Sequence, residues 1–247
     1  MSATSWQFVS LLHFFLENKG SMIREWTILL GDLTLLCLAA SVLIAAVAFK
    51  RLSPALRIFS FYLLCNLILE ALARVAVYFN TASLAMVHLF TLIEFIILSM
   101  FYGRVIREIA WFRRSYHWLV LGGSLFIILN SLFIQPINRL NSYAETLENI
   151  ILIFYAILFF YNQYQKEESH PNYDRILIWI NSGILLYISG SLFIFMFGDV
   201  LARLAADQQI LLFILNAALN LLFKIIILIA LIQVFWLDSP TGKTTDV

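Results

Sequence analysis

Ionisable and amide side chains recur every four residues inside two long apolar stretches of this sequence. One stretch carries Glu70 and Arg74, and the other carries Asn216, Asn220 and Lys224. Residues four apart lie on the same face of a helix, so each set forms a polar stripe. Ionisable groups buried in an apolar environment are costly, and they usually pair with each other, bind a ligand or relay protons. These stripes are the first candidates for chemistry in the chain.

The first stripe also contains Tyr62, Asn66 and Tyr78, again four residues apart. Glu70 and Arg74 can pair directly, which lowers the cost of burying both charges. The pattern is compatible with an ion pair that holds helices together and with a wall that binds a ligand.

Two further stretches contribute candidates. Lys224 lies deep in its apolar run, and Glu94 lies at a similar depth in another run, so we expect the two to pair. His88 precedes Glu94 by almost two turns and is expected to hold a structural hydrogen bond, contact a ligand or relay a proton. Asn181 and Tyr187 stand in a stretch rich in Ser and Gly, which suits close helix packing. Either side chain can still reach a cavity.

The composition identifies the class of protein in which these residues act. Hydrophobic residues make up 62% of the chain and charged residues 13%, whereas a soluble domain has about half and about a quarter. This is the composition of an integral membrane protein, and it excludes a nucleic-acid-binding domain, a secreted disulfide scaffold and a disordered chain. We find no metal-binding, nucleotide-binding or dinucleotide motif. We therefore expect no metal, no cofactor, no nucleic-acid partner and no assignable catalytic residue.

Seven apolar runs are long enough to cross a membrane, which takes about 20 residues. The predicted fold is all-α, a polytopic seven-helix bundle with short connections. The runs are 26–49, 55–79, 84–103, 116–134, 144–163, 176–198 and 209–237. The predicted organisation is an interfacial N-terminal segment (1–25), a transmembrane domain (26–237) and a short tail (238–247). Met22 is an alternative start to Met1.

Basic residues near the ends of the runs predict the orientation. Most of them fall in the first, third and fifth connections and in the tail, so the positive-inside rule places those parts in the cytoplasm and the N-terminus outside. We expect a multi-pass protein of the bacterial inner (cytoplasmic) membrane. The basic third loop, YGRVIREIAWFRRSYH (102–117), is expected to anchor the protein, or to contact anionic lipid headgroups or a cytoplasmic signalling partner.

Nine polar residues fall in the outer half or at the midplane under this orientation, and they predict a pocket that opens to the outside. They are Asp32, Glu70, Arg74, His88, Glu94, Glu148, Asn216, Asn220 and Lys224. Besides membrane lipids, we expect a small-molecule or lipidic ligand in this pocket. The predicted ligand-binding residues are Glu70, Arg74, His88, Glu94, Asn181, Tyr187, Asn216, Asn220 and Lys224.

Three segments resemble a family of small bacterial seven-helix membrane proteins whose activity is uncharacterised. They are HLFTLIEFIILSMFY (88–102), WINSGILLYISGSLFIFMF (179–197) and LNAALNLLFKIIILIALI (215–232). The resemblance implies the fold and the membrane location, and it singles out His88, Glu94, Asn181, Tyr187 and Asn220 among the predicted site residues. Similarity to microbial rhodopsins is distant and architectural, because Asn220 stands where those proteins carry an acid.

Three functions remain open from the sequence. The leading hypothesis is a non-enzymatic sensor or regulatory protein that passes a helix shift to the cytoplasmic connections. The first alternative is an intramembrane enzyme acting on lipid, with Glu70, His88 and Glu94 as acid–base candidates. The second is a proton- or ion-coupled transporter that uses the same carboxylates as a relay.

Overall fold

The computed structural model describes residues 21–78, 85–135, 141–165, 171–196 and 206–236. In these ranges the chain is 93% helical and has no strand. Seven helices are long and apolar enough to cross a membrane. The prediction of an all-α, multi-pass membrane protein is therefore confirmed. The predicted N-terminal interfacial segment and C-terminal tail lie largely outside the described residues.

The helices follow the predicted apolar runs closely. They are α2 (Ser21–Val47), α3 (Pro54–Tyr78), α4 (Ala85–Val105), α5 (Ala110–Leu129) with a π-helical end η1 (Asn130–Ile134), α6 (Ser142–Gln165), α7 (Pro171–Met196) and α9 (Ala206–Trp236). Pro54 and Pro171 each occupy the first residue of a helix. Proline suits that position because its missing N–H would have no partner inside the helix.

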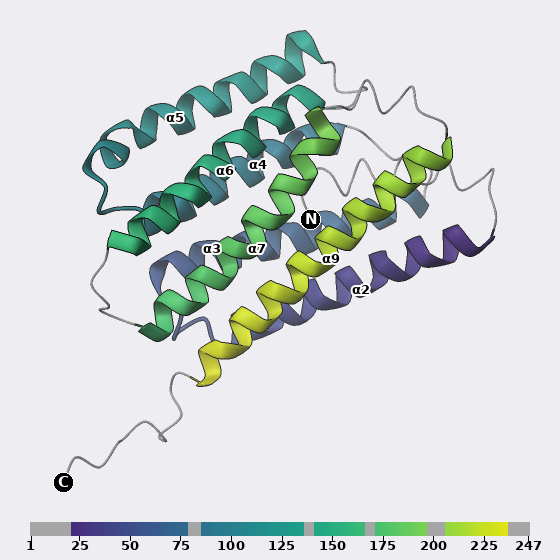
Figure 1. The fold of residues 1–247 in the computed structure, drawn as a ribbon. Helices are drawn as coiled ribbons and strands as arrows, with labels where there is room; N and C mark the ends of the chain where they lie inside the picture. Colours follow the sequence, from purple (N-terminus) through teal and green to yellow (C-terminus); the bar gives the residue numbers. More distant parts are fainter. Residues whose placement is uncertain (1–20, 79–84, 136–140, 166–170, 197–205, 237–247) are drawn as a thin grey trace.

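The helices lie side by side in one bundle (Figure 1), and six of them form a closed ring of contacts. Each helix contacts the next in the order α2, α3, α4, α6, α7 and α9, and α9 contacts α2 again. Helix α5 packs outside this ring, on α4 and α6. Accordingly α4 is the most buried of the seven spans and α5 the least. Side chains that point into the ring are thus removed from lipid on every side.

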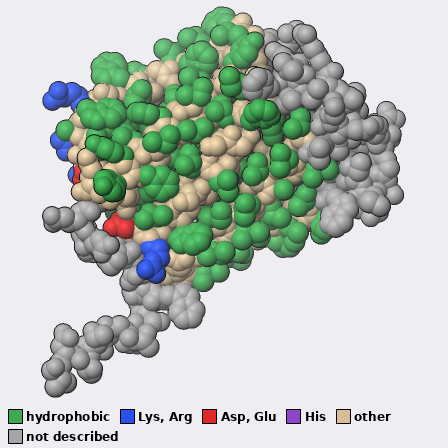
Figure 2. Space-filling view, viewed as in Figure 1, with side chains coloured by type: hydrophobic (Ala, Val, Ile, Leu, Met, Phe, Trp, Pro, Cys, Tyr) green, Lys and Arg blue, Asp and Glu red, His purple; other side chains and the backbone are tan. Residues whose placement is uncertain are grey.

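The outer surface and the ends of the bundle differ in character (Figure 2). Large apolar side chains such as Leu43, Phe61, Ile157 and Phe193 are exposed on the helix faces. Lys and Arg side chains gather at one end, which carries the α2–α3 and α4–α5 connections. We call this the basic end. An apolar belt with charges beyond it is the surface that a bilayer selects.

The fourth span begins earlier than the sequence predicted. α5 starts at Ala110 rather than at 116, and only residues 106–109 join it to α4. The third loop predicted over 102–117 is therefore wrong as a loop, since Arg113 and Arg114 lie in the first turns of α5. Apolar runs measure the thickness of the hydrocarbon layer, whereas a helix can continue into the headgroup region, where basic side chains reach water.

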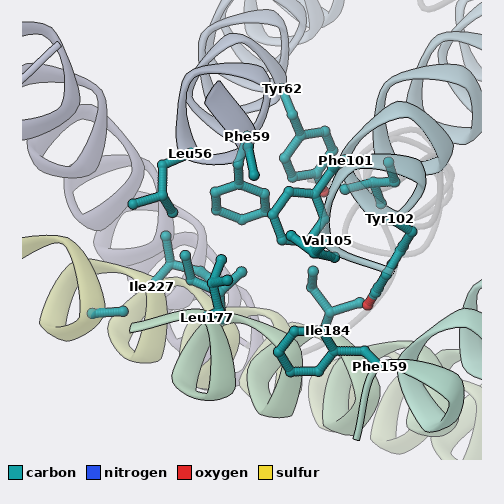
Figure 3. Close-up of a cluster of buried hydrophobic side chains, with 14 of the residues drawn as sticks. Leu56, Phe59, Tyr62, Phe101, Tyr102, Val105, Phe159, Leu177, Ile184 and Ile227 are labelled. Carbon is teal, nitrogen blue, oxygen red and sulfur yellow. The ribbon is translucent and has the colours of Figure 1, made fainter. Parts of the chain in front are cut away.

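Aromatic side chains pack against one another inside the bundle, and Figure 3 shows Phe59, Phe101 and Tyr102 among them. These three lie near the start of α3 and the end of α4, toward the basic end. The ring centroids of Phe59 and Phe101 lie 5.3 Å apart, those of Phe101 and Tyr102 5.2 Å apart, and those of Tyr102 and Tyr155 5.6 Å apart. Phe112 of α5 completes the series against Tyr155. We call these five residues the aromatic layer. All five are almost fully buried, so the layer closes the ring interior toward the basic end.

Adjacent glycines of α5 provide a matched test of its packing on α4. A Cβ on Gly123 would meet the buried Phe95 ring at 2.5 Å, whereas a Cβ on Gly122 has open space within 4 Å. We expect Gly123→Ala to destabilise the protein by about 1–3 kcal/mol through overpacking. Gly122→Ala should be neutral or stabilising by up to about 1 kcal/mol, because alanine favours the helix. Unfolding of both variants in the same detergent measures the difference; equal stabilities would contradict this packing.

Candidate functional site

The interior of the ring holds a lysine among acidic and amide side chains. Lys224 of α9 is 0% exposed, and its Nζ donates to Asn66 Oδ1 of α3 at 3.5 Å. Nζ also lies 5.9 Å from the centre of the Tyr62 ring. The Tyr62 hydroxyl in turn donates to Glu94 Oε1 of α4 at 2.9 Å. Lys224 lies within electrostatic range of both Glu94 and Glu70, so its ammonium group interacts with two carboxylates.

These contacts refine the predicted pairing of Glu94 with Lys224. The two residues do lie at matching depth, but the hydrogen bond of Lys224 goes to Asn66. Tyr62 contacts both, through its ring on one side and its hydroxyl on the other. The interaction between the two charges is therefore electrostatic and indirect.

Aromatic rings flank the lysine. Lys224 Nζ lies 4.8 Å from the centre of the Phe223 ring, within the range of a cation–π interaction. The Phe223 ring stacks on Tyr187 of α7, with centroids 5.4 Å apart and an interplanar angle of 11°. Tyr187, predicted as a ligand contact, thus belongs to the wall beside Lys224.

Two glutamates of α6 extend the acidic character of the interior. Glu145 and Glu148 are nearly fully buried and lie within electrostatic range of Glu94. Glu148 Oε1 and Asn149 Nδ2 are buried with no hydrogen-bond partner among the described residues. Buried polar atoms without partners are rare in folded proteins and indicate a place for water or a ligand.

Among the described residues, no three His, Cys, Asp or Glu side chains converge closely enough to hold a metal ion. The glutamates are thus close enough to influence one another's charge without forming a ligand shell.

An ion-pair network joins α2 to α3 at the end opposite the basic end. Arg74 contacts Asp32 Oδ1 at 2.6 Å, the Gly31 carbonyl at 2.9 Å and Glu70 Oε1 at 3.5 Å. The predicted Glu70–Arg74 pair is confirmed. The side chains of Asp32 and Arg74 are 53% and 36% exposed, so the pair stands at the rim of the ring while Glu70 points inward. Glu70 Oε2 has no hydrogen-bond partner among the described residues.

His88 ties α4 to the π-helical end of α5. Its Nδ1 lies 2.8 Å from Ser131 Oγ, and Ser131 donates to the Ile127 carbonyl at 3.0 Å.

A chain of amide side chains closes the same region. Asn130 Nδ2 donates to Asn141 Oδ1 at 3.0 Å and to Gln135 Oε1 at 3.2 Å. Asn141 Nδ2 donates to Thr91 Oγ1 at 2.9 Å, and Gln135 Nε2 donates to Ser142 Oγ at 2.9 Å. These bonds fix the turn from η1 into α6. These bonds join residues with no shared periodicity, so no pattern in the sequence predicts them.

Asn181 and Asn216, both predicted ligand contacts, hold helices together. Asn181 Oδ1 accepts from the Tyr102 hydroxyl at 2.8 Å, and its Nδ2 donates to the Ala156 carbonyl at 3.1 Å. Asn181 therefore joins α4, α6 and α7 at the aromatic layer. Asn216 Oδ1 accepts from Ser191 Oγ at 3.3 Å and joins α9 to α7.

The structure brings some of the predicted site residues together and separates others. Glu70, Glu94 and Lys224 share the interior with Glu148, which was predicted to line the pocket, and with Tyr62, Asn66 and Glu145, which were not predicted as ligand contacts. Asn220 lies one turn before Lys224 and is also buried. We call this set the central polar cluster: Tyr62, Asn66, Glu70, Glu94, Glu145, Glu148 and Lys224. His88, Asn181 and Asn216 have partners elsewhere, and Arg74 stands at the rim.

The omitted residues carried a detectable signal. Tyr62 and Asn66 belong to the same four-residue stripe as Glu70. Glu145 and Glu148 are three residues apart and therefore lie on one face of α6. A stripe that combines a tyrosine, an amide and a carboxylate thus indicates that all three side chains face the same interior.

Comparison with family models finds no match, and no curated protein or solved structure matches the chain either. Membership of the bacterial seven-helix family stays an expectation. Fold and geometry define the class: a multi-pass helical membrane protein whose helix ring encloses a buried acidic cluster. The functional argument rests on that cluster.

Proposed function

We propose that this protein is a membrane sensor that binds a small molecule with a positive charge inside its helix ring. The proposal rests on the excess of acid in the central polar cluster. There, four glutamates accompany one lysine within the part of the chain that the structure describes. No catalytic role is needed for this arrangement.

The charge balance is the first support. Lys224 lies within electrostatic range of Glu94 and Glu70, and Arg74 contacts Glu70 but also Asp32. Glu145 and Glu148 lie near Glu94. A buried carboxylate costs several kcal/mol unless a cation compensates it or a proton neutralises it. Glu70 Oε2 and Glu148 Oε1 accept no hydrogen bond from the described residues. A ligand with an ammonium or amidinium group would supply both the charge and the missing donors.

The shape of the ring favours entry from one end. The aromatic layer fills the ring between the central polar cluster and the basic end. At the opposite end Arg74 and Asp32 are exposed. A pocket reaching the cluster would therefore open at that end, which the positive-inside rule assigns to the outside.

The same helices offer a route for a signal. α3 carries Tyr62, Asn66 and Glu70 at the cluster, and α4 carries Glu94. Both helices continue through the aromatic layer to the basic end. A ligand that pulls on these side chains would shift α3 against α4 and alter their ends, where a signalling partner would bind.

The orientation is part of this proposal. Exposed basic residues dominate one end of the described chain, which supports a cytoplasmic location for that end in an inner membrane. A reporter fused at Ala110 should then give a cytoplasmic signal, and an external signal would reverse the orientation.

A proton-coupled transporter is the second candidate. Glu94, Glu145 and Glu148 lie within electrostatic range of one another, and neighbouring carboxylates in a membrane can pass protons between them. The enzyme hypothesis keeps Glu70, His88 and Glu94 as its acid–base candidates, with His88 beside Ser131 and Glu94 beside Tyr62.

Native mass spectrometry of protein gently extracted from its own membrane tests the sensor proposal. We expect a defined cationic adduct on the wild type, retained by Glu108→Gln and lost from Glu148→Gln. Glu108 is an exposed carboxylate at the basic end, so its variant controls for the loss of one negative charge. Bare wild-type protein, or an adduct that survives Glu148→Gln, would contradict the proposal. Proton flux in liposomes that depends on Glu148 would favour the transporter.

A further inference from the structure

The basic end contains a cavity that the central polar cluster does not reach. Its volume is about 500 Å³, and it lies between the first turn of α3, the last turn of α4, the start of α5 and the start of α7. Arg104, Arg107 and Arg113 line it, together with Glu108 and Tyr173. Pockets for small ligands have volumes in the same range, about 300–1,000 Å³.

The arginines make this cavity a place for negative charge. Three guanidinium groups face one carboxylate around it. Arginine binds phosphate oxygens with two parallel hydrogen bonds and a fixed geometry, so several arginines around one hollow suit a phosphate group. Anchoring by the positive-inside rule needs basic residues only near the membrane surface. It does not require residues of three chain segments to surround one cavity.

Tyr173 adds a directed hydrogen-bond donor. Ser53 caps α3 by accepting from the Leu56 N–H at 3.3 Å, and its own hydroxyl donates to the Tyr173 oxygen at 2.7 Å. Because Tyr173 is the acceptor in that bond, its proton remains available for another acceptor. Val105 and Leu177 give the cavity an apolar wall, which suits the carbon part of a phosphate ester.

We propose that this cavity binds an anionic phosphate group through Arg104, Arg107, Arg113 and the Tyr173 hydroxyl. The group belongs either to the headgroup of an anionic phospholipid or to a soluble phosphate compound. The aromatic layer separates this site from the central polar cluster, so the inference does not depend on the proposed cationic ligand.

Two matched double variants of the full-length protein provide the test. Arg104→Gln/Arg113→Gln removes two positive charges from the cavity. Arg51→Gln/Arg114→Gln removes two charges from exposed positions at the same end that do not line it. Native mass spectrometry would titrate each with phosphatidylglycerol and with phosphatidylcholine. Thermal unfolding at constant ionic strength would be compared with and without inorganic phosphate.

We expect wild-type protein to prefer phosphatidylglycerol or to be stabilised by phosphate. The cavity variant should lose about tenfold or more in affinity, as expected for lost charge-assisted hydrogen bonds, and the control less than about threefold. Phosphatidylglycerol binding without a phosphate effect identifies a lipid headgroup, and stabilisation by phosphate identifies a soluble compound. Equal losses in both double variants, equal binding of phosphatidylcholine, or no binding of either probe would overturn the proposal.

Discussion

Replacement of Lys224 by methionine is expected to destabilise the protein by about 3 kcal/mol, near the low end for breaking a buried charge pair. Lys224 is fully buried and lies within electrostatic range of Glu94 and Glu70. Methionine has a similar length, so the loss reports mainly on charge and on the bond to Asn66. Unfolding by denaturant in detergent or nanodiscs measures it. Ile225→Met, on the lipid-exposed neighbour, is the control and should change stability by less than about 0.5 kcal/mol.

The double variant Glu94→Gln/Lys224→Met shows whether the charges cooperate. If they do, the double variant should be more stable than the sum of the single effects by at least about 1 kcal/mol. Tyr62 contacts both residues, so the coupling should weaken when the cycle is repeated with Tyr62→Phe. Strictly additive effects would show that Glu94 and Lys224 are independent.

Asn181→Ala should have the second large effect, a loss of about 2–4 kcal/mol. The Asn181 amide accepts from the Tyr102 hydroxyl and donates to the Ala156 carbonyl, and it is completely buried. Alanine would leave the buried Tyr102 hydroxyl without its acceptor, and the Ala156 carbonyl would keep only its helical hydrogen bond within α6. Ser182→Ala, at the next and only partly buried position of α7, serves as control with an expected loss below about 1 kcal/mol. Thermal unfolding of the purified variants measures both.

Tyr102→Phe separates the hydrogen bond from simple packing. Phenylalanine removes the donor and keeps the ring in the aromatic layer, so adding it to Asn181→Ala should cost little further stability. If the losses of stability from Tyr102→Phe and Asn181→Ala simply add in the double variant, the hydrogen bond between the two residues makes no measurable contribution. Ligand binding by the central polar cluster should survive in all these variants, since Asn181 lies at the aromatic layer.

The polar residues show how far local pattern can lead. The four-residue spacing of Glu70 and Arg74 correctly predicted an ion pair, because both residues lie on one helix and their separation depends on helix geometry alone. The Glu94–Lys224 pairing required two helices to be placed relative to one another. The depth of each residue in the membrane was predictable from its position in its span. The placement of Tyr62 between Glu94 and Lys224 was not, because the rotation of each helix about its axis and the choice of neighbouring helices depend on packing.

The start of α5 was predicted six residues too late, at 116 instead of Ala110. An apolar window cannot detect a helix that extends beyond the hydrocarbon layer, so Arg113 and Arg114 were assigned to a loop. Their placement in the first turns of α5 brings Arg113 next to Arg104 and Arg107 of the adjoining segment. The sequence predicted contacts between this basic segment and anionic lipid headgroups, but the cavity that its arginines line depends on this helix start.

The class of protein, the seven spans and the polar faces are predictable from the sequence, because hydropathy and helical periodicity are properties of contiguous residues. The fold adds what no local pattern contains: six helices close into a ring with α5 outside, Glu145 and Glu148 lie near Glu94, and Asn181 joins three helices. Inside a bilayer every helix is equally apolar, so neighbours are selected by side-chain packing and interhelical hydrogen bonds between distant segments. Those choices place the central polar cluster on one side of the aromatic layer and the arginine-lined cavity on the other.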